Sequence, residues 1–254
     1  MIISVIQAPL VWQNPIANLL YFQKTIRGIK AKPNLIVLPE MFTSGFTMHP
    51  VAVAESMQGE SVSWIKALAK EKNTAIIGSI AIFENKKFYN RLLFVYPSGE
   101  IFHYDKRHLF TLAGENIAYD SGNEKLIVEY NGWKICPLIC YDLRFPVFSR
   151  NYEDYDLLVY IANWPDVRIN AWNILLKARS VENMCYTVGV NRIGEDNNGH
   201  FYPGHSQIVD EIGNYVLPPK ELDEGVFTVF LDKNKMFETR NKLSFLKDRD
   251  LGLK

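Results

Sequence analysis

The feature that most constrains the fold is a repeated order of short apolar segments and amphipathic stretches. Near the start, apolar segments at 2–8 and 34–38 flank a stretch with helical spacing, and the same order recurs over 157–190. Apolar segments that pair as hairpins lie between these two regions. This order predicts a mixed α/β fold with helices outside the sheet. About ten strands are expected, and two packed sheets accommodate that number better than one wide open sheet.

The individual elements follow from the same pattern. Asn14 followed by Pro15 is typical of a helix start, and Asn131–Gly132 is a strong hairpin signal. Strands are expected at 2–8, 34–38, 74–83, 88–96, 101–106, 126–129, 134–139, 157–162, 186–190, 206–209 and 226–231, with a turn at 211–214 before the last. Helices are expected at 16–30, from a cap at Ser61, at 145–150 and at 171–181. A charged tail follows Phe237. No linker or repeat interrupts the chain, so a single domain over 1–254 is expected.

Charge and cysteine content narrow the class of protein. Lys+Arg and Asp+Glu balance at 28 each, and no basic run favours nucleic acid or an acidic membrane surface as a partner. Three cysteines without a CxxC pair argue against a disulfide framework or a zinc site. The first basic residue is Lys24, so the N-terminus does not resemble a secretory signal, and a cytoplasmic location is expected.

The stretch Lys134–Pro146 is the strongest candidate for chemistry. An apolar run leads to Cys140, and polar or aromatic residues follow until a proline. This order suits a buried strand that delivers a thiol to its carboxyl end, where a turn supplies main-chain N–H groups. Taken alone, Cys140 is more readily explained as a small core residue, as most free cysteines are.

Two further ionisable residues occupy similar positions. Glu40 follows the apolar segment 35–38, and Lys106 follows the segment 101–104. Ligands bind α/β sheets where strands end, so three such residues indicate one common site. Each has an ordinary alternative, because a glutamate can cap a helix and a lysine can be solvated.

Three segments together resemble the signature blocks of the nitrilase superfamily of carbon–nitrogen hydrolases. They are Pro39–Phe42, Tyr104–Phe110 and Cys140–Pro146, in the family's order Glu, Lys, Cys. The match extends through Gly114–Glu115, Ala162–Trp164, Arg179–Asn183 and Gly204–Ser206. Within the superfamily, the chain is most similar to the branch containing omega-amidases. The resemblance implies an αββα sandwich, a homodimer, a small amide as substrate, and no cofactor or metal.

The resemblance also implies catalytic roles. Cys140 would attack the amide and form a thioester, while Glu40 would act as general base and acid. Lys106 would stabilise the oxyanion together with the main-chain N–H of Tyr141. Glu115 would be a second carboxylate beside Lys106, although it could instead be a solvated loop residue.

Besides Tyr141, two residues are candidates for substrate binding. Arg144 could bind a substrate carboxylate through two parallel hydrogen bonds, or it could pair with Asp142 or a helix end and hold the turn. Trp164 could form a wall of the pocket or pack in the core.

The remaining polar and sulfur residues are assigned to structural roles. Cys136 and Cys140 would be roughly 13 Å apart on one strand, which is too far for a disulfide. Cys136 and Cys185 are therefore expected in the core. Arg179 and Glu182 have the spacing of an internal ion pair. His108 and His205 remain possible partners of a Cys–His arrangement.

The sequence leaves several functions open. Nitrile hydrolysis, N-carbamoyl hydrolysis and acyl transfer are other activities of the same superfamily. A thiol-based redox or interaction protein, with Cys140 as a regulatory residue, is an alternative of a different class.

Overall fold

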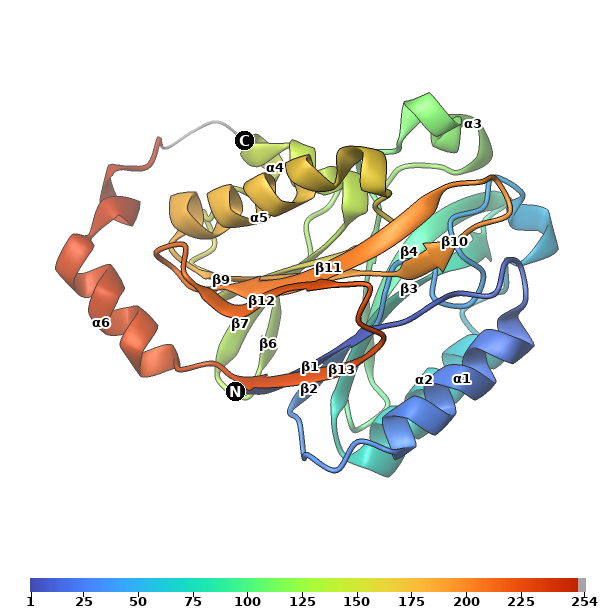
Figure 1. The fold of residues 1–254 in the computed structure, drawn as a ribbon, viewed down its shortest axis with the longest axis horizontal. Coiled ribbons are helices and arrows are strands. Elements are labelled where there is room, and N and C mark those ends of the chain that lie inside the picture. The colour runs from blue at the N-terminus through green and yellow to red at the C-terminus, as the bar shows by residue number, and fades with distance from the viewer. Residues whose placement is uncertain (251–254) are drawn as a thin grey trace.

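Two mixed β-sheets packed face to face form the centre of the molecule, and helices cover their outer faces (Figure 1). The structure is a computed structural model that describes residues 1–250. One sheet has the strand order β13-β1-β2-β3-β4-β5, and the other has the order β10-β11-β9-β8-β7-β6 with β12 paired to β11. The predicted αββα sandwich is confirmed.

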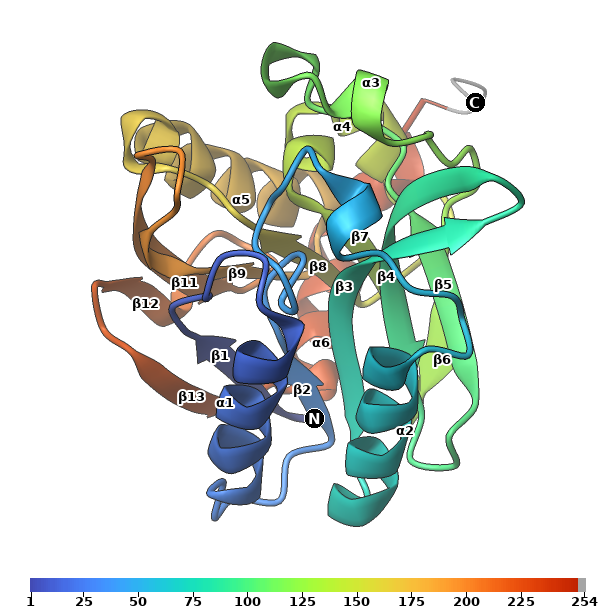
Figure 2. The same ribbon diagram turned by 90° about the vertical axis from the view of Figure 1, so that its right-hand side faces the viewer.

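The first sheet is parallel in its centre and antiparallel at its edges. β1 pairs in parallel with β2 and β2 with β3, whereas β4, β5 and β13 add antiparallel pairs. Helices α1 and α2 lie side by side on its outer face (Figure 2). The elements are β1 (Ile2–Gln7), α1 (Pro15–Arg27), β2 (Leu35–Val37), α2 (Glu60–Lys72), β3 (Ala75–Glu84), β4 (Lys87–Val95), β5 (Ile101–Asp105) and β13 (Gly225–Phe230).

The second sheet has a parallel centre of β7, β8 and β9. Helix α5 packs along its outer face, and the short helices α3 and α4 lie near one end of the sandwich (Figure 1). The elements are α3 (Glu115–Ala118), β6 (Val128–Tyr130), β7 (Trp133–Ile139), α4 (Pro146–Ser149), β8 (Leu157–Ala162), α5 (Ile169–Asn183), β9 (Tyr186–Asn191), β10 (Ile193–Glu195), β11 (Phe201–Val209), β12 (Tyr215–Glu221) and α6 (Lys233–Leu243).

The alternation of side chains along the parallel strands produces two core regions. Val5 and Val37 belong to the core cluster that contains Leu138 of β7. Their neighbours in sequence, Ile36 among them, belong to the cluster that contains Phe22 of α1. Strands buried on both faces carry continuous apolar runs, which is why these strands were visible in the sequence.

The start of α2 differs from the prediction. The helix begins at Glu60 with Gly59 at the cap position, and the Ser61 side chain does not cap it. The carboxylate of Glu55 takes that role, because it accepts hydrogen bonds from the main-chain N–H groups of Ser61 and Val62 at 3.0 and 2.9 Å. Helix α1 also differs from its predicted bounds, because it ends at Arg27, three residues earlier than expected.

Four elements were not predicted, and the four-residue helix α3 is one of them. β10 has three residues, and β12 carries two prolines at the edge of its sheet. Helix α6 has one buried residue, Met236, and therefore lacks an apolar stripe. The turn at 211–214 leads into β12, and the two last predicted strands, β11 and β13, lie in different sheets.

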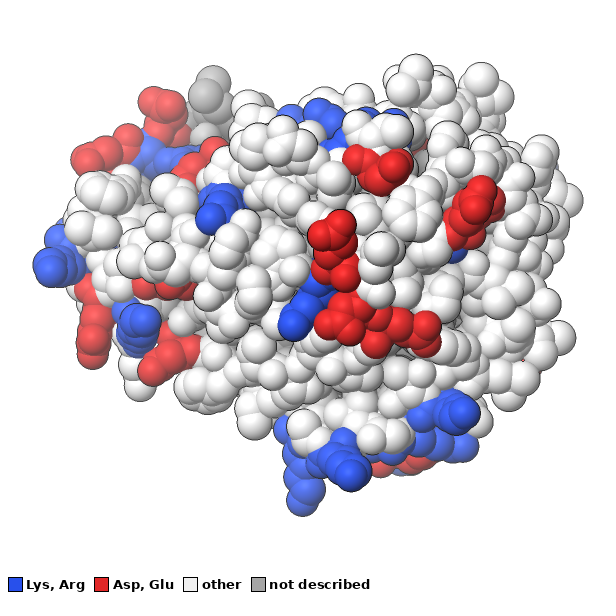
Figure 3. Space-filling view, viewed as in Figure 1, with Lys and Arg blue, Asp and Glu red and all other residues white. Residues whose placement is uncertain are grey.

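The exterior carries charges of both signs. On the face shown in Figure 3, acidic and basic side chains are scattered among uncharged ones, and a basic group lies at the lower edge, where Figure 1 places α1 and α2. The charged tail after Phe237 comprises the second half of α6 and a short turn at Phe245–Asp248. Residues 251–254 of this tail lie outside the described residues. Among the helices of residues 1–250, none has the length and apolar character needed to cross a membrane.

Candidate active site

Cys140 stands at the point where β7 ends. It is the first residue of the 3₁₀ turn Cys140–Arg144, and its φ of 43° is in the left-handed region that non-glycine residues rarely adopt. Such strain at a strand end is typical of a residue whose side chain must be presented to a ligand. The Cys140 Sγ lies 3.9 Å from the main-chain oxygen of Asn163. Asn163 directly follows β8, the strand that pairs with β7.

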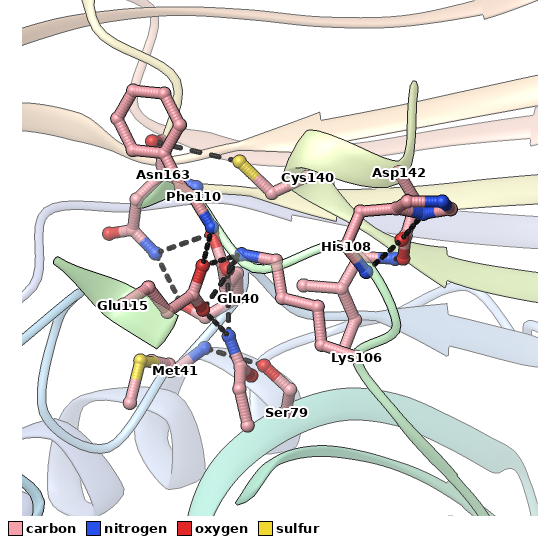
Figure 4. A network of polar contacts seen from close by, with 12 residues as sticks. Glu40, Met41, Ser79, Lys106, His108, Phe110, Glu115, Cys140, Asp142 and Asn163 are labelled. Atoms are coloured by element: carbon pink, nitrogen blue, oxygen red, sulfur yellow. Dashed lines mark hydrogen bonds and ion pairs between the residues drawn. The ribbon is translucent and has the colours of Figure 1, made fainter. Parts of the chain in front are cut away.

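A buried lysine between two carboxylates lies beside this thiol (Figure 4). The Lys106 Nζ is 2.9 Å from Glu40 Oε1 and 2.9 Å from each carboxylate oxygen of Glu115. All three side chains are fully shielded from solvent. Lys106 follows β5 and Glu40 follows β2, so the two polar residues belong to one sheet and Cys140 to the other. The structure thus brings the four predicted catalytic residues together.

Four donors fix the Glu40 carboxylate. Its Oε1 accepts hydrogen bonds from Lys106 and from Asn90 Nδ2, the latter at 2.8 Å. Its Oε2 accepts from the main-chain N–H of Asn163 at 2.8 Å and from the Asn163 side-chain amide at 3.4 Å. These contacts hold the carboxylate at one position next to the thiol.

Electrostatics keep the lysine charged and the thiol neutral. Burial alone would lower the pKa of Lys106, but the carboxylates of Glu115 and Glu40 outweigh it and raise that pKa above its usual value. Burial, with Glu40 adding to it, raises the pKa of Cys140 well above that of an ordinary thiol. Burial and the neighbouring Glu40 also raise the pKa of Glu115. The resting thiol therefore needs a base at the moment of attack.

A third buried carboxylate, Asp142, connects the turn of Cys140 to the segment that carries Lys106. Asp142 Oδ2 accepts hydrogen bonds from the Tyr104 hydroxyl at 2.8 Å and from the Ile139 N–H at 3.0 Å. Its Oδ1 accepts from the His108 N–H at 3.1 Å and lies 2.7 Å from His108 Nδ1. The imidazole of His108 is stacked on Phe145, with ring centroids 3.7 Å apart.

A cavity of about 270 Å³ opens above the thiol. Cys140, Lys106 and Tyr141 line it, together with both predicted substrate-binding side chains, Arg144 and Trp164. The Arg144 guanidinium lies 5.0 Å from the centre of the Trp164 ring. Asp142 is bonded to other donors and forms no ion pair with Arg144. The residues that complete the lining are mostly aromatic or polar, and they include Trp12, Phe46, Phe110, Arg168, Asp196 and Tyr202.

The structural assignments can also be compared with the structure. Cys136 and Cys185 are buried and free, as expected, and Arg179 forms its ion pair with Glu182 at 3.1 Å. Neither histidine is a partner of the thiol. His108 is bonded to Asp142, and His205 Nδ1 is bonded to the side chain of Asn173. A Cys–His arrangement with either residue is therefore wrong.

Three residues of the site were missed in the sequence. Asn90 is a buried amide of β4 that precedes Arg91 and an apolar run, and it could have been noted as a polar group that needs a buried partner. Asn163 follows a strand, like Glu40 and Cys140, and the same argument could have singled it out. Arg168 gave no local signal, because it lies in an ordinary turn before α5.

Comparisons with known proteins agree with this geometry. A model of the carbon-nitrogen hydrolase family matches residues 2–241. The omega-amidase YafV of Escherichia coli strain K12 is 43% identical over 98% of this chain and 96% of its own length. A 2-oxoglutaramate amidase of Bacillus subtilis is 32% identical over 97% of this chain and 96% of its own. A CN-hydrolase superfamily protein of Xanthomonas campestris, with an arsenic adduct in its active site, superposes with a TM-score of 0.96 at 38% identity, covering 99% of this chain and 98% of the other.

Proposed function

Since the chain belongs to the carbon-nitrogen hydrolase family, we propose that it is an omega-amidase that hydrolyses the terminal amide of a small substrate bearing a carboxylate. 2-Oxoglutaramate, which would yield 2-oxoglutarate and ammonia, is the substrate we expect, because two relatives of nearly full length are an omega-amidase and a 2-oxoglutaramate amidase. The observation that carries the proposal is the position of Cys140 beside a buried lysine held by two carboxylates.

Acylation begins with the neutral thiol. The Cys140 Sγ attacks the amide carbon while Glu40 accepts its proton, so that the anionic thiolate never has to persist in the buried site. The carbonyl oxygen becomes an oxyanion, which Lys106 Nζ and the Tyr141 N–H stabilise. Glu40 then returns the proton to the nitrogen, the C–N bond breaks, and ammonia leaves behind a thioester.

Deacylation uses the same groups, with water in place of the thiol as the attacking nucleophile. Glu40 accepts a proton from water as the water oxygen attacks the thioester carbon. The second oxyanion is stabilised at the same position, and the C–S bond breaks with return of the proton to sulfur. The sum is one amide and one water consumed, with one carboxylic acid and one ammonia released. Glu115 contributes by holding Lys106 and by keeping it charged throughout.

Arg144 and Trp164 would hold the far end of the substrate. Within residues 1–250, the Arg144 guanidinium has no carboxylate partner, and it lies over the Trp164 ring at the cavity wall. An arginine in such a place can bind a carboxylate through two parallel hydrogen bonds. The distance in space between the Arg144 guanidinium and the Cys140 thiol would then determine how far the substrate carboxylate can lie from the amide carbon.

We further propose that the protein acts as a homodimer. Apolar side chains of the described tail are exposed, with Phe237 at 40% and Phe245 at 59%, and burial against a second chain would remove them from water. Light scattering at micromolar concentration should give twice the mass of one chain. A monomer under those conditions would refute this part of the proposal.

Ammonia release tests the function directly. The wild-type protein should release ammonia from 2-oxoglutaramate, while Cys140→Ala should release none and Cys136→Ala should remain active. Turnover of small nitriles or N-carbamoyl compounds in preference to all amides would assign the other activities of the superfamily. Oxidation-dependent binding without turnover of any amide would indicate a thiol switch.

A further inference from the structure

Two arginines of the cavity differ from all other arginines in residues 1–250. Arg144 and Arg168 both line the cavity, and within that range neither side chain donates a hydrogen bond or forms an ion pair. Every other arginine donates to a carboxylate or a main-chain carbonyl, namely Arg27, Arg91, Arg107, Arg150, Arg179, Arg192, Arg240 and Arg249. Arg144 is exposed and Arg168 is half-buried, so the N–H groups of both side chains are open to the cavity and can donate hydrogen bonds to acceptor groups of a ligand.

Aromatic rings hold both guanidinium groups at the cavity wall. Arg144 lies over Trp164 and Arg168 over Phe110, each 5.0 Å from the ring centre. The Trp164 Nε1 donates a hydrogen bond to the main-chain oxygen of Arg168 at 2.8 Å, which connects the two supports. An arginine stacked on a ring keeps the N–H groups at its edge available, because the ring occupies only its face.

The charges around the cavity make this end of it positive. Lys106 is paired with the two carboxylates of Glu40 and Glu115, so it adds no net positive charge to the cavity, and it belongs to the reacting end. Asp196 is the acidic residue of the lining, and its oxygens accept hydrogen bonds from the Tyr202 hydroxyl and from the main-chain N–H groups of Asn198 and His200. Apart from Lys106, the lining thus carries two guanidiniums and one carboxylate, and this net positive charge favours oxygen acceptors and repels an ammonium.

From this arrangement we infer that Arg168 determines specificity at the carbon next to the substrate carboxylate. The inference rests on the proposed function and deepens it: Arg144 binds the carboxylate, and Arg168 donates a hydrogen bond to an oxo group on the adjacent carbon. The same guanidinium disfavours an ammonium group on that carbon. The site thus selects omega-amides of 2-oxo acids against omega-amides of 2-amino acids such as L-glutamine.

Three substrates of equal length separate the contributions. 2-Oxoglutaramate carries an oxo group beside the carboxylate, glutaramate carries only hydrogens there, and L-glutamine carries an ammonium. In Arg168→Met, kcat/KM should fall about 10- to 100-fold for 2-oxoglutaramate, because a hydrogen bond from a charged donor is lost. The value for glutaramate should change little, and the value for L-glutamine should rise because the like charge is removed.

Variants of both arginines identify which one contacts the group on the carbon next to the substrate carboxylate. Arg168→Lys keeps the positive charge without the planar fork, so it should still reject L-glutamine while losing part of the preference for the oxo group. Arg144→Met should lower kcat/KM for all three substrates by a similar factor, because all three carry the carboxylate. Arg27→Met, at a surface ion pair with Glu71, is the control and should leave all three values unchanged.

The outcomes distinguish this inference from the proposed function. A wild-type protein that releases ammonia from none of the three substrates would refute the proposed function itself. An active wild type whose Arg168→Met variant loses the same factor on every substrate, with an unchanged melting temperature, would overturn the role of Arg168. A change of the oxo-to-amino preference in Arg144→Met and not in Arg168→Met would overturn it as well.

Discussion

His108 Nδ1 lies 2.7 Å from Asp142 Oδ1, and this contact joins the segment that follows Lys106 to the turn that begins at Cys140. The Tyr104 hydroxyl reaches the other oxygen of the same carboxylate at 2.8 Å. Asp142 thereby joins the segment that carries Lys106 to the turn that carries Cys140, although it lines no part of the cavity. We expect this carboxylate to position the proposed catalytic groups, which belong to different sheets.

Replacing Asp142 should therefore damage stability and rate together. Asp142→Ala leaves its buried donors without an acceptor, and each such group costs about 1–3 kcal/mol. Tyr104→Phe removes a single hydrogen bond and should cost about 1 kcal/mol. Denaturant unfolding gives the stability, and kcat gives the rate. The positioning role would be wrong if Asp142→Ala unfolded at the wild-type midpoint and retained wild-type kcat.

Cys140→Ala should abolish turnover without loss of the fold. The substitution removes one sulfur atom from a side chain at the cavity wall, so the core is unaffected. Cys185→Ala, which alters a buried core position, should remain active with lower stability. Ammonia release and circular dichroism measure the two effects. A turnover rate in Cys140→Ala equal to that of the wild type would exclude a covalent mechanism through this thiol.

Glu40→Gln should make the thiol more acidic while slowing turnover by about 10²- to 10⁴-fold. Burial and the Glu40 carboxylate both raise the pKa of Cys140, whereas Lys106 lowers it. Removing the negative charge of residue 40 therefore lowers the pKa of Cys140. At a given pH, a larger fraction of the thiol is then ionised in the variant than in the wild type. Alkylation by iodoacetamide, followed by mass spectrometry against pH, should move to lower pH in the variant.

The two buried cysteines provide an internal control for this measurement, because burial raises the pKa of Cys185 to about 12 and the intact fold shields both thiols. An alkylation profile that moves to higher pH in Glu40→Gln would contradict the electrostatic argument. Unchanged turnover would remove Glu40 from the mechanism.

Lys106→Met should lower the rate by about 10²- to 10³-fold through loss of an oxyanion donor. It also leaves two buried carboxylates without their cation, and breaking such a pair costs about 3–5 kcal/mol. In the double variant Lys106→Met, Glu115→Gln one of these charges is gone, so part of the stability should return while the activity does not. Recovery of activity together with stability would show that Lys106 acts only on the fold.

The sequence predicted the parts of the site that depend on strand ends. Glu40, Lys106 and Cys140 each follow an apolar strand, and the fold places these ends together. Asn90 was not predicted because its role depends on the register of β4 against β3 and β5, which pattern alone does not determine. Arg168 was not predicted because its significance is the lack of a partner, which is a property of the folded molecule.

The errors in the fold have a similar cause. The cap of α2 comes from Glu55, which no spacing rule connects to the helix start. Helix α6 is held by charged contacts, among them Lys233 and Arg240 with the buried Asp156, and it shows no apolar periodicity. Elements held mainly by polar contacts leave little trace in a hydrophobic pattern.

The division of the site between the two sheets has a consequence for how the protein loses activity. Glu40 and Lys106 come from strands of one sheet, and Cys140 and Asn163 come from strands of the other. A slip of one sheet against the other by a fraction of a residue would separate base from nucleophile while each sheet kept its own hydrogen bonds. Thermal inactivation should then precede the loss of β-sheet circular dichroism, so that turnover serves as a gauge of the alignment between the two layers.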